Sequence, residues 1–534
     1  MHIRVFLICN KGYMEDNQYQ GPQLQPDMPS QYGKKIVKNA VSNYVGMAVA
    51  IIVTFFLSPF IIHHLGNAAY GLWALFQSLF GYFGLLDLGL STASVKYIAQ
   101  YKALNDKKSI DTIVSTLFTT YLVIGTLSLA IALILSLFIT RLFNIPPELS
   151  LIAREAIIIG GFNSLITFSY GIMNGTLAGY QRYDIINIIG VARYVLYVPA
   201  VILLLEAGQG VLFLFYLNLF LAIIVLIFVY YLIVYRLQYA TIKFHLFSLT
   251  SLKTAFGYSV IVFLNDIAGQ IASTVGNVVT GIMLTMADVA FSSLANRLVN
   301  YMAMLATNFL GITLPVYSEM DAQGDKERIK KFYLEFVVLS VSVFTPAMMF
   351  LVVFHKDFFL LWIGKGYDKA AVLALLLGIG VYIHIPLGYV TGMVLFGLAK
   401  HLYLSITNFI TMVANILITV ICIKRFGVIG IGYSWIITSV TANLLITRYT
   451  NKLLHVGLYE YLKTIIPPAF FGIFALLFYY LASHYSPPHH FVILAIDGTI
   501  GFVIYMIMFF FFGLSKLQKE RYIYILKSFG NKFI

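Results

Sequence analysis

Polar and ionisable side chains recur at helical spacing within two apolar stretches of the chain. In the first stretch, spacings of 4, 3, 4 and 3 residues place five polar side chains on one face of a helix, namely Asp266, Gln270, Ser273, Asn277 and Thr280. The second stretch contains Asn296, Arg297 and Asn300. A guanidinium offers a fork of donors that matches phosphate oxygens, and it binds them more strongly where water is scarce. We therefore expect a substrate cavity lined by Asp266, Gln270 and Asn300, with Arg297 as its anion anchor.

Further candidate side chains lie in other apolar stretches. Arg193 and Asn43 are expected to line the same cavity, and the carboxylates of Asp87 and Asp266 are candidates for gating or ion coupling. Structural roles are the alternatives. They are an ion pair between Asp266 and Arg297, a helix cap at Asp87, and the use of Asn, Ser and Thr to hold helices together. The sequence leaves both sets of roles open.

The composition requires a bilayer as solvent. Hydrophobic residues make up 60% of the 534 residues, charged residues make up 11%, and the mean hydropathy is +0.87, whereas soluble domains carry about 25% charged residues. The sequence contains no phosphate-binding loop and no Ser/His/Asp set, and the adjacent pairs His63-His64 and His489-His490 lack the spacing of metal ligands. We therefore expect a membrane protein that is not an enzyme and has no metal or cofactor.

Fourteen apolar stretches are long enough to span a bilayer, which takes about 20 residues. They are residues 39–62, 70–95, 111–138, 152–178, 185–205, 210–235, 256–284, 287–316, 333–354, 370–397, 402–423, 428–449, 465–483 and 491–513. The sequence therefore predicts an all-α polytopic membrane protein with 14 transmembrane helices. Of the 35 Lys and Arg residues, 26 fall on the side that holds both termini and seven on the other. Because basic loops remain in the cytoplasm, we expect both termini to be cytoplasmic.

The chain also repeats itself at an offset of 218 or 219 residues. The matching turns are Asn105-Asp106-Lys107 with Gly324-Asp325-Lys326, Leu177-x-Gly179-x-x-Arg182 with Leu395-x-Gly397-x-x-Lys400, and Gly208 with Gly427. Three landmarks at one offset predict two six-helix lobes of the same topology, followed by an extra helix pair. The expected domains are a disordered cytoplasmic leader (1–33), an N-terminal lobe (34–238), a C-terminal lobe (239–452), the helix pair (453–514) and a basic cytoplasmic tail (515–534).

Residues at the turns resemble those of a known family. They are Leu65-Gly66, Tyr70-Gly71, Asp87-Leu88-Gly89-Leu90, Gly324-Asp325-Lys326, Trp362-x-Gly364 with Tyr367, Leu395-x-Gly397-x-x-Lys400 and Gly427-x-x-Gly430. In their order and spacing, over about residues 35–513, the chain resembles the O-antigen, capsule and exopolysaccharide flippases of the multidrug/oligosaccharidyl-lipid/polysaccharide exporter superfamily.

The resemblance implies a function in cell-surface polysaccharide biosynthesis. Such proteins move an undecaprenyl-diphosphate-linked oligosaccharide repeat unit from the cytoplasmic to the outer leaflet of the bacterial inner membrane. They do so by alternating access, coupled to a proton or sodium gradient. The implied partners are this lipid-linked oligosaccharide, the coupling ion, the lipid bilayer and the polysaccharide polymerase machinery. The few positive charges expected in the cavity favour a neutral repeat unit.

Three other functions fit parts of the sequence. A cation-coupled multidrug exporter of the same superfamily would have a more acidic or more apolar cavity. A peptidoglycan-precursor flippase would have more arginines in its first two spans. A membrane polymerase or ligase would have a larger external loop than this chain, whose longest runs over residues 355–369. The polysaccharide flippase is therefore the preferred interpretation.

The nomination of Asp266 as the coupling carboxylate is directly testable. Asp266→Asn removes the negative charge and keeps the size of the side chain, so transport should lose its dependence on an imposed ion gradient. The measurement compares transport with and without the gradient in membrane vesicles. Gradient-driven transport that is unchanged in the variant would contradict this role.

Overall fold

The computed structural model describes residues 30–514 and Lys519, and for residues 30–41, 258–262, 264–266 and 268 it describes the backbone alone. All regular elements in this part of the chain are helices. The all-α fold predicted from the sequence is therefore confirmed. The predicted leader and basic tail fall almost entirely outside the described residues.

The first half of the chain forms the helices that we call the N-terminal lobe. They are α2 (Ser30–Gly84), η1 (Leu85–Asp87), α3 (Leu90–Ala103), α4 (Lys107–Leu142), η2 (Pro147–Leu149), α5 (Ser150–Gly179), α6 (Tyr183–Glu206), α7 (Val211–Tyr231) and η3 (Leu232–Arg236). A short connection carries η4 (Phe244–Leu246) and leads into the second half.

The second half forms the C-terminal lobe and the extra helix pair. The lobe consists of α8 (Leu249–Met283), α9 (Met286–Gly311), α10 (Thr313–Ala322), α11 (Lys326–Trp362), α12 (Asp368–His384), η5 (Ile385–Val390), α13 (Thr391–Gly397), α14 (His401–Phe426), η6 (Gly427–Ile429) and α15 (Gly430–Leu453). The pair consists of α16 (Leu458–Tyr485) and α17 (Phe491–Met508), which continues as η7 (Phe509–Gly513).

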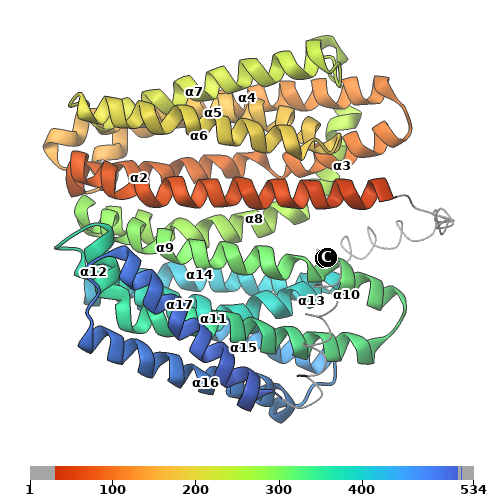
Figure 1. The fold of residues 1–534 in the computed structure, drawn as a ribbon. Coiled ribbons are helices and arrows are strands. Elements are labelled where there is room, and N and C mark those ends of the chain that lie inside the picture. The colour runs from red at the N-terminus through yellow and green to blue at the C-terminus, as the bar shows by residue number, and fades with distance from the viewer. Residues whose placement is uncertain (1–29, 515–518, 520–534) are drawn as a thin grey trace.

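The long helices lie side by side along one common direction (Figure 1). In this view α2 lies between α4–α7 on one flank and α8 and α9 on the other, and α16 and α17 lie on the outer flank of the C-terminal lobe. We call the end of the bundle at which α2 turns at Gly66 the Gly66 end, and the opposite end, where α2 begins, the N-terminal end.

The predicted number of spans is confirmed. Eleven helical ranges in the described residues are long and apolar enough to cross a bilayer. Two of these ranges hold two spans each: Ser42–Asp87 (46 residues) is broken by the non-helical Gly66, and His401–Leu453 (53 residues) is divided by η6. A straight helix of 46 residues would be about 69 Å long, more than twice the thickness of the hydrocarbon layer. With α8, which has 35 residues, the spans number fourteen.

The internal repeat is visible in the backbone. Left-handed residues end helices at matching positions in the two lobes, at Asn105 and Gly324 (φ 54° and 70°), at Gln181 and Ala399 (59° and 52°), and at Gly208 and Gly427 (75° and 60°). Asp106 and Asp325 then cap α4 and α11 by accepting from backbone N–H groups at 3.0 Å. The hydroxyl of Ser109 donates to the Asp106 carboxylate at 2.6 Å and lowers its pKa. The repeated turns are therefore helix stop and start signals.

The second predicted span is wrong as a single helix over residues 70–95. The structure breaks it at η1, and Leu88 and Gly89 follow with positive φ (53° and 74°) before α3 begins. Hydropathy does not reveal this break, because the residues around it are apolar and Asp87 is the one charged side chain there.

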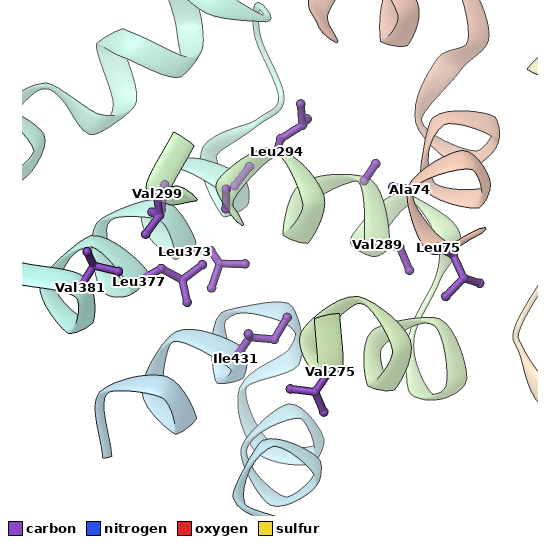
Figure 2. Close-up of a cluster of buried hydrophobic side chains, with 14 of the residues drawn as sticks. Ala74, Leu75, Val275, Val289, Leu294, Val299, Leu373, Leu377, Val381 and Ile431 are labelled. Carbon is purple, nitrogen blue, oxygen red and sulfur yellow. The ribbon is translucent and has the colours of Figure 1, made fainter. Parts of the chain in front are cut away.

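A buried apolar cluster joins the two lobes (Figure 2). Its labelled members come from α2, α8, α9, α12 and α15, and they are Ala74, Leu75, Val275, Val289, Leu294, Val299, Leu373, Leu377, Val381 and Ile431. Lipid tails are as apolar as these side chains, so close packing rather than the exclusion of water must favour the contact.

The closest approach of α2 and α9 lies at Gly71, near the Gly66 end. A Cβ atom on Gly71 would lie 1.7 Å from the carbonyl oxygen of Met286 and 3.3 Å from the nitrogen of Ala290. No side chain fits between the two backbones, so glycine is required for this contact between the lobes.

Gly71→Ala should therefore destabilise the protein. We expect a loss of about 1–3 kcal/mol from overpacking, measured as a lower thermal unfolding temperature in detergent. Gly171→Ala on α5 is the matched control, because a Cβ atom there meets nothing within 4 Å. A Gly71→Ala protein as stable as the control would contradict the tight α2–α9 contact.

Candidate functional site

Arg297 lies in the middle of α9, roughly 16 Å along the helix from Met286. Its Nη1 donates to Ser58 Oγ at 2.6 Å, and its guanidinium lies 5.7 Å from the centre of the Trp73 ring. Both partners belong to α2, so Arg297 reaches from the C-terminal lobe into the N-terminal lobe. Neither partner is charged, and no carboxylate pairs with Arg297 among the described side chains.

This environment leaves the guanidinium able to bind an anion. One of its five N–H donors is used by Ser58, and the face of an indole ring attracts the cation without neutralising it. Thr54 and Tyr301 extend the same polar contact between α2 and α9 through a hydroxyl pair at 2.8 Å. The arrangement fits the predicted role of Arg297 as an anion anchor, which stays a prediction.

The two lobes are tied together at the Gly66 end. The hydrogen bonds that cross between them include His63 Nε2 with Ile363 O (2.6 Å), Trp362 Nε1 with Phe55 O (2.8 Å), Tyr367 OH with Asn67 Oδ1 (2.7 Å) and Asn144 Nδ2 with Ile282 O (3.0 Å). Three of these bonds join the part of α2 around Gly66 to the end of α11 and its connection to α12. This end of the contact between the lobes is therefore held closed.

Arg193 lies in a different place from Arg297. It lines a pocket of about 300 Å³ within the N-terminal lobe, and its Nη2 donates to Asn218 Oδ1 at 3.3 Å. The other polar lining residues are Gln77, Asn163, Ser164 and Thr167. An arginine among amides and hydroxyls can bind an anionic or hydroxyl-rich group.

Asn300 lines a larger pocket, of about 430 Å³, within the C-terminal lobe. The pocket lies among α8, α9, α12, η5, α14 and α15, and its amide side chains are Asn296, Asn300, Asn408, Asn415 and Asn443. No carboxylate lines it among the described residues. Its chemistry is that of a neutral site rich in hydrogen-bonding groups.

The remaining predicted cavity residues lie apart from both pockets or outside the described side chains. Asn43, near the N-terminal end of α2, accepts from Asn187 Nδ2 of α6 at 2.7 Å. Gln270 of α8 packs against Gly81 of α2, where a Cβ atom would lie 2.1 Å from its Nε2. The side chain of Asp266 lies outside the described residues. The structure thus distributes the predicted residues over both lobes and their contact.

Asp87 forms the cap of α3 after the break in the second span. Its carboxylate accepts from Ser91 N at 3.3 Å, from Ser91 Oγ at 2.8 Å and from the hydroxyl of the fully buried Tyr121. The sequence left two roles open for Asp87, helix capping and gating. These bonds fit the capping role.

Sequence reasoning missed several residues of these sites. Ser58 and Trp73 gave no signal, because only the folded chain brings them to Arg297. His384 gave a signal that was overlooked: it is an ionisable residue within the predicted span 370–397. It lines the larger pocket and contacts Asn443. Among the described residues, no group of three or more His, Cys, Asp or Glu side chains could hold a metal ion.

Fourteen helical spans in two repeated lobes and an extra helix pair define the chain as a multi-pass membrane protein. Comparisons with known proteins agree. The chain is 18% identical to a multidrug-resistance MATE family transporter of the MOP superfamily in its inward-facing conformation, with a TM-score of 0.66 over 77% of this chain and 94% of that one. It is 13% identical to the lipid II flippase MurJ in an inward closed conformation, with a TM-score of 0.67 over 89% and 99% of the two chains. These likenesses establish the fold.

The chain belongs to the polysaccharide biosynthesis protein family, whose model matches residues 63–372. It is also 25% identical over 134 residues to the uncharacterized membrane protein EpsK of Bacillus subtilis (strain 168). This match covers 25% of the chain and about a quarter (26%) of the length of EpsK. The family resemblance expected from the turn residues is thereby confirmed.

The capping role of Asp87 leads to a prediction. Asp87→Ala removes the cap of α3 and leaves the buried hydroxyl of Tyr121 without its acceptor, so we expect a loss of about 1–3 kcal/mol in stability. Asp87→Asn keeps an acceptor oxygen and should lose less. Thermal unfolding of both variants in detergent measures the difference. Unchanged stability with abolished transport would instead assign Asp87 to gating.

Proposed function

We propose that this protein is a flippase that carries a polyprenyl-diphosphate-linked oligosaccharide repeat unit from the cytoplasmic to the outer leaflet for cell-surface polysaccharide biosynthesis. It works by ion-coupled alternating access of its two lobes. Family membership supports a role in polysaccharide biosynthesis, and the fold supports transport. The observation that carries the proposal is the guanidinium of Arg297 at the contact between the lobes, which has no carboxylate partner among the described side chains.

A lipid-linked diphosphate is an anion whose lipid tail remains in hydrocarbon, so its phosphates cross the membrane near the lobe contact. Arg297 is the donor fork for these oxygens, because Ser58 and Trp73 orient it without consuming its charge. Ionic hydrogen bonds of this kind are strong where water is excluded.

The two pockets are the candidate binding sites for the sugars. Sugars present many hydroxyl groups, and both pockets offer amide and hydroxyl partners for them. Arg193 adds one positive charge in the N-terminal lobe. Asn300 and Asn296 bring the larger pocket next to α9, the helix that carries Arg297.

The orientation follows from the distribution of basic residues. The N-terminal end of the bundle is cytoplasmic by the positive-inside rule, and the Gly66 end therefore faces outward in the bacterial inner membrane. The bonds that tie the lobes at the Gly66 end close the outer side. Substrate then enters from the cytoplasmic side, and these bonds break when the lobes open outward.

The anchor role of Arg297 is tested by substitution. Removing a charged hydrogen-bond donor costs about 1.5–3 kcal/mol, so Arg297→Ala should bind undecaprenyl-diphosphate oligosaccharide roughly 10- to 100-fold more weakly while still folding and inserting. Binding is measured on the purified protein in detergent. A strain whose only copy carries the variant should lose its surface polysaccharide.

Arg154→Ala is the matched control, because Arg154 is exposed near the Gly66 end of α5. It should bind the glycolipid and support surface polysaccharide as the unmodified protein does. Arg297→Lys keeps the charge and loses the fork, so its affinity should be intermediate. Normal surface polysaccharide with Arg297→Ala would rule out the anchor role.

A further inference from the structure

His384 lies deep within the C-terminal lobe, where α12 ends. It is about 24 Å along the helix from Asp368, and about 20 Å of helix separates it from Gly397 at the N-terminal end. An ionisable side chain near the middle of a bilayer is costly and is a functional candidate for that reason. His384 therefore needs an explanation that the proposed anion anchor does not supply.

The hydrogen bonds around His384 fix its tautomer. Asn443 Nδ2 donates to Ser439 Oγ at 3.0 Å, so its Oδ1 is the acceptor that lies 2.8 Å from His384 Nδ1. Nδ1 must then carry the hydrogen, and Nε2 keeps its lone pair. In the described part of the chain Nε2 has no hydrogen-bond partner, and the imidazole lines the 430 Å³ pocket. The pocket thus contains one free nitrogen base.

The backbone is built around this imidazole. A π-helix, η5, follows His384 directly, and π-bulges within α-helices are frequent at functional sites. A Cβ atom at Gly388 would lie 2.4 Å from His384 Cε1 and Nδ1, so glycine makes room for the ring. The carbonyls of the π-helix are satisfied from outside it, Pro386 O by Tyr461 and Leu387 O by Thr447.

The first lobe shows that the fold does not need this histidine. At the repeat offset of 218 residues, His384 corresponds to Ile166 of α5, and Asn443 at 219 corresponds to Ile224 of α7. α5 runs from Ser150 to Gly179 without a π-helix. The histidine, its amide partner and the π-helix are thus present in one copy of a helix pair whose other copy folds without them.

We propose that His384 is the proton-binding site through which transport is coupled to a pH gradient, an inference that rests on the proposed function. In one conformation Nε2 takes a proton from the water of the open pocket, and the imidazolium is stabilised by the neutral amide and hydroxyl oxygens of its lining. In the other conformation the same nitrogen releases that proton to the opposite side. A sodium ion would find neutral oxygens and no carboxylate among the described lining residues, whereas histidine titrates near physiological pH.

Few other titratable groups approach the imidazole. Tyr389 packs edge-on against it, with ring centres 4.4 Å apart, and Tyr382 on the same helix bonds to Thr345. The ionisable residues on the helices packed around α12 and η5 include Asp288, Arg297 and Tyr301 (α9), Lys330, Tyr333 and Glu335 (α11), Arg448 and Lys452 (α15), and Glu460 and Tyr461 (α16). Others lie at the ends of α11, with Lys326, Glu327, Arg328 and Lys331 at the N-terminal end of the bundle and His355, Lys356 and Asp357 toward the Gly66 end. Asp288 lies near Lys369 at the Gly66 end, Lys330 pairs with Glu460, and Arg297 is directed at α2. The described structure therefore places no charged partner on His384.

The test uses the purified protein in liposomes with undecaprenyl-diphosphate oligosaccharide. The fraction of glycan accessible to an impermeant lectin is measured at steady state under a gradient of one pH unit or under a sodium gradient. One coupled proton shifts the ratio between leaflets by about tenfold per pH unit. The unmodified protein and the control His401→Gln, at the start of α14, should show this shift. In His384→Gln the ratio between the leaflets should no longer respond to the pH gradient.

The outcomes separate this inference from the proposed function. No translocation by the unmodified protein under any gradient contradicts the proposed function itself. Two outcomes overturn the assignment to His384 and leave the proposed function standing. One is translocation that follows the sodium gradient alone, and the other is a pH-driven shift that is retained in His384→Gln and lost in Asp266→Asn.

A second variant tests whether His384 is the proton-binding site if His384→Gln does not fold. Asn443→Asp places a carboxylate at the atom that now accepts from Nδ1, and a nearby opposite charge favours the protonated imidazole. The pH at which transport is half-maximal should rise by about 1 unit or more. An unchanged midpoint would overturn the proposal.

Discussion

The contact between α2 and α9 is the constraint on which the rest of the structure depends. A guanidinium in hydrocarbon needs hydrogen-bond acceptors or an aromatic face nearby. α2 supplies both partners of Arg297, the hydroxyl oxygen of Ser58 and the Trp73 ring. The absence of a side chain at Gly71 lets the two helices approach closely beside Met286. The two lobes are therefore joined where the strongest candidate for substrate binding lies.

The lobes share one topology and differ in their chemistry. Matching left-handed turns end matching helices in both, yet Arg297 corresponds to Ser78 at the repeat offset of 219 and His384 to Ile166 at 218. The framework is thus repeated, whereas Arg297 and His384 have no ionisable counterpart in the first copy.

The sequence predicted the spans from hydropathy and the repeat from its turn residues, and it singled out Arg297 as a candidate from its charge within a span. All three signals are local. The family resemblance rested on turn residues such as Gly71, Trp362 and Tyr367, and the structure gives their physical reason: they tie the lobes at the Gly66 end. The break after Asp87 was missed because it leaves hydropathy unchanged. The partners of Arg297 were missed because they lie more than 200 residues away in the sequence, and only packing brings them together.

The most direct measurement of the central claim is translocation itself. Purified protein is placed in liposomes that contain undecaprenyl-diphosphate oligosaccharide, and the glycan that an impermeant glycosidase can reach is followed over time. Under a proton or a sodium gradient, the account predicts that the accessible fraction of glycan rises in liposomes with the protein and stays constant in empty liposomes. Equal time courses with and without the protein, under both proton and sodium gradients, would contradict it.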